Sequence, residues 1–231
     1  MKILCVIPAR GGSKGVKKKN IRKLNNRPLI AYTIESTLSS KLFDDVIVST
    51  DDNEIAEISK SYGAQVPFIR PSELAQDDSS SDQVILHSVL EMRKLGFEYD
   101  IVVLRDCTVP FIDAVDMKKM LDLFQQSDCN AVFGSIRAHP NPYFGMMECD
   151  DNGFLIPSKI PEKEVTRRQD APIVYDVVGI FIVDAKNFLK TKKIYSGKIL
   201  PFEISKEHGY MIDFEFDFKV AELLINSKNS H

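Results

Sequence analysis

Short apolar runs alternate with longer amphipathic segments through the first 135 residues of the chain. Apolar runs bounded by polar or turn residues are typical of buried strands, and apolar residues recurring at helical spacing are typical of helices. The predicted strands are Lys2–Pro8, Asp45–Ser49, Val66–Ile69, Ile101–Leu104 and Ala131–Ile136. The predicted helices are Pro28–Ser40, Asn53–Tyr62, Asp82–Leu95 and Ala114–Gln126. This alternation favours right-handed crossovers and a mostly parallel sheet covered by helices on both faces.

The alternation stops at His139–Pro142. From there to about Asp176 the chain is rich in proline, glycine and charge, which indicates an inserted hairpin arm (approximately 139–176) of the kind that packs against a second subunit. The apolar run Val177–Val183 is predicted to return to the sheet, and Glu215–Asn226 is predicted to be the last helix. The final residues, Ser227–His231, are expected to fray.

Composition narrows the classes of protein that the chain can belong to. The 231 residues carry 30 Lys and Arg against 33 Asp and Glu, a net charge of −3, which argues against a nonspecific nucleic-acid binder. We expect no membrane segment, because no apolar run is long enough to cross a bilayer. The four cysteines form no C-x-x-C pair, which favours reduced thiols and a cytoplasmic protein.

The strongest local signal follows the first strand, where Ile-Pro-Ala-Arg-Gly-Gly-Ser-Lys-Gly spans positions 7–15. Its three glycines allow close backbone approach to a ligand and positive φ angles, and Arg10, Lys14 and Lys19 supply positive charge. The segment is neither a P-loop nor a dinucleotide-binding fingerprint. A solvated basic turn is the alternative on charge alone. Its position at the carboxyl end of the first strand favours a polyphosphate site.

Several separated motifs in the same order resemble those of the acylneuraminate cytidylyltransferases, which use CTP and an acidic nine-carbon 2-keto sugar to make a CMP-sugar and pyrophosphate. The segments that carry the resemblance are 7–15, 27–34, 48–52, 70–75, 168–170 and 212–213 with 217–219. The resemblance implies a single Rossmann-like, three-layer α/β nucleotidyltransferase domain over residues 1–231, with a dimerisation arm and a homodimeric assembly.

The resemblance also implies roles for individual residues. It assigns catalysis to Arg10, Lys19 and Asp213. The nucleotide-binding positions that it implies are Ala9, Arg10, Gly11, Gly12, Ser13, Lys14, Lys19, Asn20 and Ser81. For Ser81 a helix N-cap is the structural alternative.

Transfer of a nucleotidyl group requires the phosphate charge to be neutralised, which implies Mg²⁺ or Mn²⁺ together with the basic residues. Asp213 matches a metal-binding aspartate of the family, but Met211 stands where many members have a second one. Asp106, at the end of a central strand, is the candidate replacement, so that Asp106 and Asp213 together hold the metal. The alternative is that Asp106 pairs with Arg105 or caps a helix.

The sugar pocket departs from the family pattern as well. Val177-Val178-Gly179 replaces an Asn-Gly-Ala motif, and Phe181 replaces a tyrosine. Fewer polar partners favour a deoxygenated acceptor of the legionaminic or pseudaminic type. The candidate sugar-binding residues are Arg105, Arg168, Gln169 and Phe181, with an exposed salt bridge as the alternative for Arg168.

The implied partners are therefore CTP and an acidic 2-keto sugar, with neither nucleic acid nor membrane. Two other functions stay open at this point. The chain could be a cytidylyltransferase for 3-deoxy-octulosonate or another acidic sugar, or a catalytically weakened CTP-binding protein.

Overall fold

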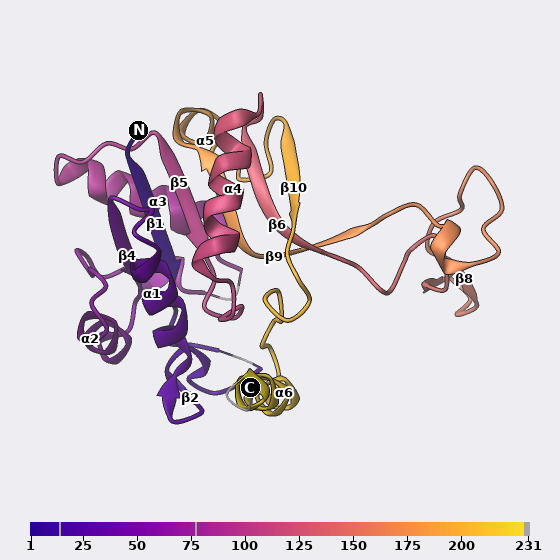
Figure 1. Ribbon diagram of the computed structural model, residues 1–231, viewed down its shortest axis with the longest axis horizontal. Helices are drawn as coiled ribbons and strands as arrows, with labels where there is room; N and C mark the ends of the chain where they lie inside the picture. The colour runs from indigo at the N-terminus through magenta and orange to yellow at the C-terminus, as the bar shows by residue number, and fades with distance from the viewer. Residues whose placement is uncertain (14, 77, 229–231) are drawn as a thin grey trace.

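The computed structural model describes residues 1–13, 15–76 and 78–228. A six-stranded sheet has the strand order β10-β6-β9-β5-β1-β4 (Figure 1). Every neighbouring pair is parallel except those made by β9, which is antiparallel to both β5 and β6. The strands are β1 (Ile3–Pro8), β4 (Asp45–Ser49), β5 (Ile101–Arg105), β6 (Ala131–Arg137), β9 (Tyr175–Asp184) and β10 (Ile199–Glu203). The prediction of a mostly parallel α/β sheet is confirmed.

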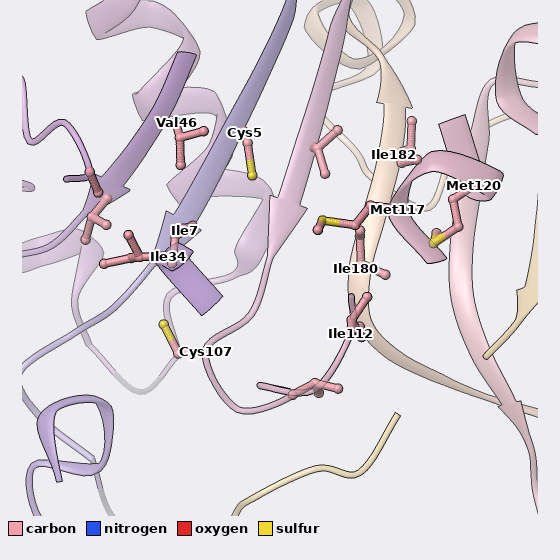
Figure 2. Close-up of a cluster of buried hydrophobic side chains, with 14 of the residues drawn as sticks. Cys5, Ile7, Ile34, Val46, Cys107, Ile112, Met117, Met120, Ile180 and Ile182 are labelled. Atoms are coloured by element: carbon pink, nitrogen blue, oxygen red, sulfur yellow. The ribbon is translucent and has the colours of Figure 1, made fainter. Parts of the chain in front are cut away.

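Helices cover both faces of this sheet. Side chains of α1 (Leu29–Ser40), α2 (Asn53–Ser61) and α4 (Ala114–Gln126) share one core cluster, part of which Figure 2 shows. Side chains of α3 (Ser81–Lys94) and α5 (Ala185–Thr191) share the other. In β1, Ile3, Cys5 and Ile7 belong to the first cluster and Leu4 and Val6 to the second. Because successive side chains of a strand point to opposite faces, β1 is buried on both sides.

Some sequence predictions missed an element. Val66–Ile69 is not a strand, because the chain makes only an isolated bridge between Gln65 and Ile47 before it leaves the sheet. Pro67 has no N–H to donate to a ladder, which explains the early exit. The pattern also failed to predict α5 and β10. The edge strand β10 contains Pro201, which an edge strand tolerates, and this proline hid the strand from the pattern.

The segment between β6 and β9 is the predicted arm. In Figure 1 it reaches away from the rest of the molecule and carries an antiparallel hairpin of β7 (Met147–Cys149) and β8 (Leu155–Pro157), followed by the short helix η3 (Arg168–Asp170). The arm exposes large apolar side chains, including Phe154 at 70% and Ile160 at 84% of their surface. A concentration of exposed apolar residues marks an interaction surface.

The last helix, α6 (Glu215–Lys228), closes the carboxyl edge of the sheet. Its buried residue Phe218 packs with Ile212, Val16 and Leu24 in a third cluster. This cluster ties α6 to the segment after β1 and to the small hairpin of β2 (Lys23–Leu24) and β3 (Arg27–Pro28). The helix includes Ser227 and Lys228, so the expectation of fraying is wrong for these two residues, and residues 229–231 lie outside the described part.

The two remaining short helices are η1 (Lys19–Ile21) and η2 (Ser72–Leu74). Within the described ranges, no helix combines the length and the apolar character that a membrane crossing requires.

Candidate functional site

A cavity of ≈ 270 Å³ lies at the carboxyl ends of β1 and β5, beside the first residue of α3. Its lining includes six of the residues singled out by the sequence: Arg10, Ser13, Lys19, Asn20, Ser81 and Asp106. The other lining residues are Pro8, Arg70, Leu74, Gln76, Ser79, Val84, Cys107 and Thr108. Ligands of open α/β sheets bind at this edge, and the N–H groups at the start of a long helix favour anions.

Two of the three glycines after β1 lie where another part of the chain leaves no room for a side chain. A Cβ on Gly11 would lie 2.6 Å from Asp52 Oδ2, and one on Gly15 would lie 2.5 Å from the Asp213 carbonyl oxygen. Gly12 faces open space. The expected positive φ is absent from Gly11 and Gly12, and among the described residues around them Lys18 is left-handed, with φ 52°. The expectation of positive φ was wrong for Gly11 and Gly12, and the left-handed Lys18 is the N-cap of η1. Lys14 lies outside the described residues.

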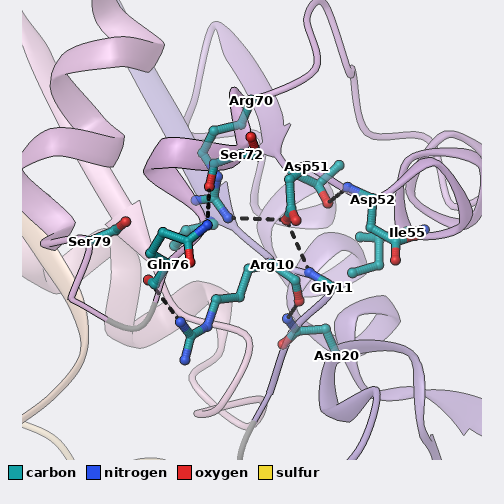
Figure 3. Close-up of polar contacts among 12 residues, drawn as sticks. Arg10, Gly11, Asn20, Asp51, Asp52, Ile55, Arg70, Ser72, Gln76 and Ser79 are labelled. Atoms are coloured by element: carbon teal, nitrogen blue, oxygen red, sulfur yellow. Dashed lines mark hydrogen bonds and ion pairs between the residues drawn. The ribbon is translucent and has the colours of Figure 1, made fainter.

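Hydrogen bonds fix the loop around the cavity (Figure 3). The Gly11 N–H donates to Asp51 Oδ1 at 3.1 Å, and Asn20 Nδ2 donates to the Arg10 carbonyl at 3.0 Å. Arg10 Nη1 donates to the Gln76 carbonyl at 2.9 Å. Ala9 is buried, and its N–H donates to the Ser49 carbonyl. The Arg10 side chain is therefore held against residues that come before α3, at the mouth of the cavity.

Lys19 and Asp213 form an ion pair although they lie far apart in the sequence. Lys19 Nζ is 2.8 Å from Asp213 Oδ1 and also donates to the Ile212 carbonyl at 3.1 Å. The Lys19 side chain is 13% exposed and that of Asp213 is 45% exposed. Two of the three residues that the resemblance assigned to catalysis, Lys19 and Asp213, are therefore in direct contact.

Asp106 projects from the end of β5 into the same region. Burial raises the pKa of its carboxyl group to about 6, the positive charges of Arg105 and Lys19 offset part of this rise, and Asp213 adds to it. The alternative of a helix cap is wrong, because Asp113 is the N-cap of α4. Arg105 donates to the backbone carbonyl oxygen of Asp106, so the Asp106 carboxylate is not the acceptor of this hydrogen bond. Two carboxylates and a lysine thus interact electrostatically at one edge of the sheet.

Arg70 is a lining residue that the sequence reasoning did not assign. It is 3% exposed, and its Nη2 lies 3.7 Å from Asp51 Oδ1. Its Nε has no hydrogen-bond partner among the described residues, and burial lowers the pKa of the guanidinium. Its only signal in the sequence was the Arg-Pro start of the 70–75 motif. A buried guanidinium of this kind beside a cavity is a candidate for ligand recognition.

Ser81 lines the cavity, and the preceding residue, Ser80, is the N-cap of α3. Ser80 accepts from the Gln83 N–H and forms a capping box with that glutamine. The capping alternative that the sequence left open for Ser81 is therefore wrong by one residue. Asp77, in the polar segment before the helix, lies outside the described residues.

The four candidate sugar-binding residues are not brought together in one chain. Arg105 is fully buried and does not line the cavity. Arg168 and Gln169 are exposed on the arm, where Arg168 bonds to the His139 carbonyl. Phe181 is half-buried in β9 and makes an edge contact with Phe133, with ring centroids 4.9 Å apart.

Tyr195 completes this aromatic group and was also missed by the sequence reasoning. Its ring centroid lies 4.9 Å from that of Phe133 and 6.4 Å from that of Phe181. Burial raises the pKa of its hydroxyl group, and so does the nearby negative charge of Asp106. Tyr195 is therefore within electrostatic reach of Asp106, although none of the three rings is among the residues that line the cavity.

A separate group of possible metal ligands lies at the start of α4. The ligand atoms of Asp113, Asp116 and His208 lie within 4.8 Å of one another. His208 Nδ1 is 2.6 Å from Asp116 Oδ2, and both aspartates already form the capping box of α4. This group shares no residue with the cavity lining.

The fold is shared with a solved structure. The structure of CMP:2-keto-3-deoxy-manno-octonic acid synthetase complexed with CTP superposes with a TM-score of 0.72, over 99% of this chain and 100% of that chain, at 18% sequence identity. At that level of identity the likeness shows the fold alone.

Sequence similarity defines the class further. The family model described as "Cytidylyltransferase" matches residues 4–221, and this chain belongs to the cytidylyltransferase family, a group of nucleotidyltransferases. CMP-N,N'-diacetyllegionaminic acid synthase of Campylobacter jejuni is 37% identical over 231 residues, covering 98% of this chain and 96% of its own length. Pseudaminic acid cytidylyltransferase of the same species is 38% identical over 226 residues, covering 97% and 96%.

Proposed function

We propose that this protein transfers CMP from CTP to the anomeric hydroxyl group of a nonulosonic acid of the sialic, legionaminic or pseudaminic type. The products are a CMP-sugar and pyrophosphate, and one domain spanning residues 1–231 carries the reaction. The observation that carries the proposal is the convergence of Arg10, Lys19 and the start of α3 on one cavity at the carboxyl edge of the sheet. Relatives that are 37% and 38% identical over nearly the whole chain are named for such acceptors.

Arg10 and Lys19 bind the triphosphate in this proposal, together with the loop at Gly11, Gly12 and Ser13. Each charge-assisted contact with a phosphate contributes about 1.5–3 kcal/mol, and more where it strengthens as charge moves onto the leaving pyrophosphate. Asp213 keeps Lys19 in place through the 2.8 Å ion pair, so that the ammonium group needs little reorganisation when the phosphates arrive.

The base and ribose of CTP have further candidate partners in the lining of the cavity. Asn20 is 8% exposed, and Arg70 has a buried Nε without a partner among the described residues. Ser81 lines the cavity at the start of α3. Buried donors that lack partners favour a polar ligand over an apolar one.

The donor set fits Mg²⁺. Asp106 and Asp213 offer carboxylate oxygens, which Mg²⁺ prefers together with phosphate oxygens and water, and their charges interact in the folded protein. When bound, Mg²⁺ neutralises phosphate charge during in-line displacement at the α-phosphorus. The two aspartates would hold it, with Asp106 serving in place of the aspartate that Met211 replaces.

In this proposal the acceptor lies toward an aromatic group outside the cavity lining. Phe181, Phe133 and Tyr195 form an aromatic group near Asp106, which suits the methyl and acyl groups of a deoxygenated nonulosonic acid. Arg168 and Gln169 would bind the acidic acceptor from the arm of a second copy in a homodimer, and the exposed apolar residues of the arm support such an assembly. Guanidinium is suited to bidentate contact with a carboxylate.

The experiment is a pyrophosphate-release assay with CTP, Mg²⁺ and a panel of 2-keto sugar acids. Release with N,N'-diacetyllegionaminic, pseudaminic or N-acetylneuraminic acid is the expected result. Release with 3-deoxy-octulosonate alone would point to a different acidic sugar, and tight CTP binding without release for any acid would point to a nucleotide-binding protein. Asp106→Asn and Asp213→Asn are each expected to lose Mg²⁺-dependent turnover, and a fully active Asp106→Asn would overturn the metal assignment.

A further inference from the structure

Arg105 is a fully buried arginine at the end of β5 that the catalytic scheme does not use. Its exposed fraction is 0%, which is rare for a residue whose charge strongly favours water. Its hydrogen bonds go to backbone carbonyl oxygens, so the guanidinium is held by peptide dipoles. A side chain that is so costly to bury needs a structural consequence that a smaller apolar residue would not provide.

The carbonyls that it holds belong to the loop between β5 and α4 and to one point of β9. Nη1 donates to the carbonyl of Asp106 at 3.0 Å and to that of Val109 at 2.7 Å. Nη2 donates to the Ile112 carbonyl at 3.3 Å, and Nη1 also donates to the Gly179 carbonyl at 3.5 Å. One planar group therefore joins the beginning, the middle and the end of the loop 106–112.

The same loop reaches both candidate metal ligands. Asp106 is its first residue, and the Asp106 N–H donates to the Gly179 carbonyl at 2.8 Å. The Thr108 carbonyl accepts from the Ile212 N–H at 2.8 Å, and Ile212 immediately precedes Asp213. A displacement of the loop would thus move Asp106 directly and Asp213 through one backbone hydrogen bond.

Gly179 supports the loop from the opposite side. Its φ is +53°, and a Cβ at this position would lie 2.5 Å from the Cβ of Val109. The loop can therefore approach β9 only because residue 179 has no side chain. The guanidinium and the glycine therefore both hold the loop, one through hydrogen bonds and the other by leaving room for Val109.

We propose that Arg105 is a positioning residue for the metal carboxylates. From inside the core it holds the loop 106–112, and this loop sets the spacing of Asp106 and Asp213. The inference rests on the proposed function, in which these two aspartates hold a divalent cation. It replaces the expectation that Arg105 contacts the sugar.

Lysine cannot reproduce this role, because a single ammonium group does not span carbonyls that a planar fork reaches together. Methionine fills a similar volume but donates nothing and leaves the carbonyls unpaired. The informative variants are therefore Arg105→Lys and Arg105→Met. Gly179→Ala pushes the loop from the other side and leaves the arginine intact. Val46→Ala, which removes buried methyl groups from β4 in the core, controls for a general loss of stability.

The test measures Mn²⁺ binding by electron paramagnetic resonance, with the full chain and saturating CTP, and CTP binding separately by calorimetry in EDTA. Arg105→Lys, Arg105→Met and Gly179→Ala are each expected to weaken Mn²⁺ binding at least tenfold, with CTP affinity in EDTA changed less than threefold. Val46→Ala is expected to change neither affinity. All affinities are compared at a temperature at which circular dichroism shows each variant folded, and Arg105→Lys with Gly179→Ala decides the matter if Arg105→Met does not fold.

Folded Arg105→Lys with Mn²⁺ affinity within twofold of the wild type would overturn the positioning role. So would a parallel loss of Mn²⁺ and metal-free CTP affinity, because that pattern indicates general damage to the site. Failure of the proposed metal site would look different. Wild-type protein that binds CTP but no Mn²⁺ would show that Asp106 and Asp213 do not hold a metal, and Arg105 would then have no metal ligands to position.

Discussion

Replacing Asp106 with asparagine is expected to make the metal-free protein more stable and the enzyme inactive. Asparagine has nearly the same shape as aspartate and carries no charge at any pH. In the folded protein, burial raises the pKa of the Asp106 carboxyl to about 6, from an ordinary value of 3.8. A carboxylate whose ionisation is opposed by folding destabilises the folded state, and such tension between stability and activity is typical of functional sites.

The size of the effect follows from the difference between the two pKa values. A rise from 3.8 to about 6 corresponds to about 3 kcal/mol at most. Asp106 lines an open cavity, where water screens part of this cost, so we expect about 1–3 kcal/mol. For a chain of this length, that is a rise in Tm of about 3–10 °C.

The stability difference between Asp106→Asn and the wild type should depend on pH. Below about pH 3.8 the carboxyl is protonated in both the folded and the unfolded state, and the cost vanishes. Between that pH and about 6 the wild-type protein loses stability as the pH rises, and above 6 the full cost remains. The advantage of Asp106→Asn in EDTA should therefore grow from pH 5 to pH 7 and then stay constant.

Differential scanning calorimetry in EDTA at pH 5, 6, 7 and 8 measures this advantage. Addition of CTP with Mg²⁺ should stabilise the wild type and have a smaller effect on Asp106→Asn. A variant that is less stable than the wild type at pH 7, or a difference in Tm that does not vary with pH, would refute the conclusion that burial opposes ionisation of Asp106 in the folded protein.

Three further predictions concern the loop, the arm and the second acidic group. Gly15→Ala should lower the free energy of unfolding by about 1–3 kcal/mol, because its Cβ would meet the Asp213 carbonyl at 2.5 Å, whereas Gly12→Ala, in open space, should leave Tm unchanged in calorimetry. Ile160→Asp on the arm should shift the protein from dimer to monomer in analytical ultracentrifugation and lower turnover more than tenfold, with CTP affinity retained; an unchanged sedimentation coefficient would count against the arm contact. His208→Gln should leave the Mg²⁺ concentration for half-maximal activity within twofold of the wild type, and a larger rise would place the metal at the start of α4.

The parts of the fold that follow a regular pattern could be predicted from the sequence. The apolar run Asp45–Ser49 and the capped segment Ala114–Gln126 have the predicted bounds in the structure. Val66–Ile69 was mistaken for a strand because Val66, Phe68 and Ile69 make an apolar run around Pro67, and β10 was missed because Pro201 interrupts it. In both segments a proline lacks the backbone N–H that a strand inside a sheet needs. An edge strand such as β10 tolerates that loss, and the sequence does not show which segment lies at an edge.

The site could be predicted only where it is local in sequence. The segment 7–15 was assigned correctly to the carboxyl edge of the sheet, since position after the first strand determines that placement. The residues that come from elsewhere were harder. Nothing local predicts that Arg70 is buried beside Arg10, or that Lys19 pairs with Asp213 across almost the whole chain.

Arg105 shows most clearly what could not be predicted from the sequence. It was a candidate sugar-binding residue, and the structure instead surrounds it with carbonyl oxygens. Whether an arginine faces a ligand or the core depends on the loop that folds over it. Here that loop packs against Gly179 of β9, which is far from it in the sequence.

A competition reaction tests the central claim most directly. Wild-type protein is incubated with CTP, Mg²⁺ and equal amounts of N,N'-diacetyllegionaminic acid, pseudaminic acid, N-acetylneuraminic acid and 3-deoxy-octulosonate, and the CMP-sugars are identified by mass spectrometry. The account predicts that a CMP-nonulosonate predominates, with one pyrophosphate formed for each CMP-sugar. CMP-octulosonate as the main product, or no CMP-sugar at all from protein that binds CTP, would contradict it.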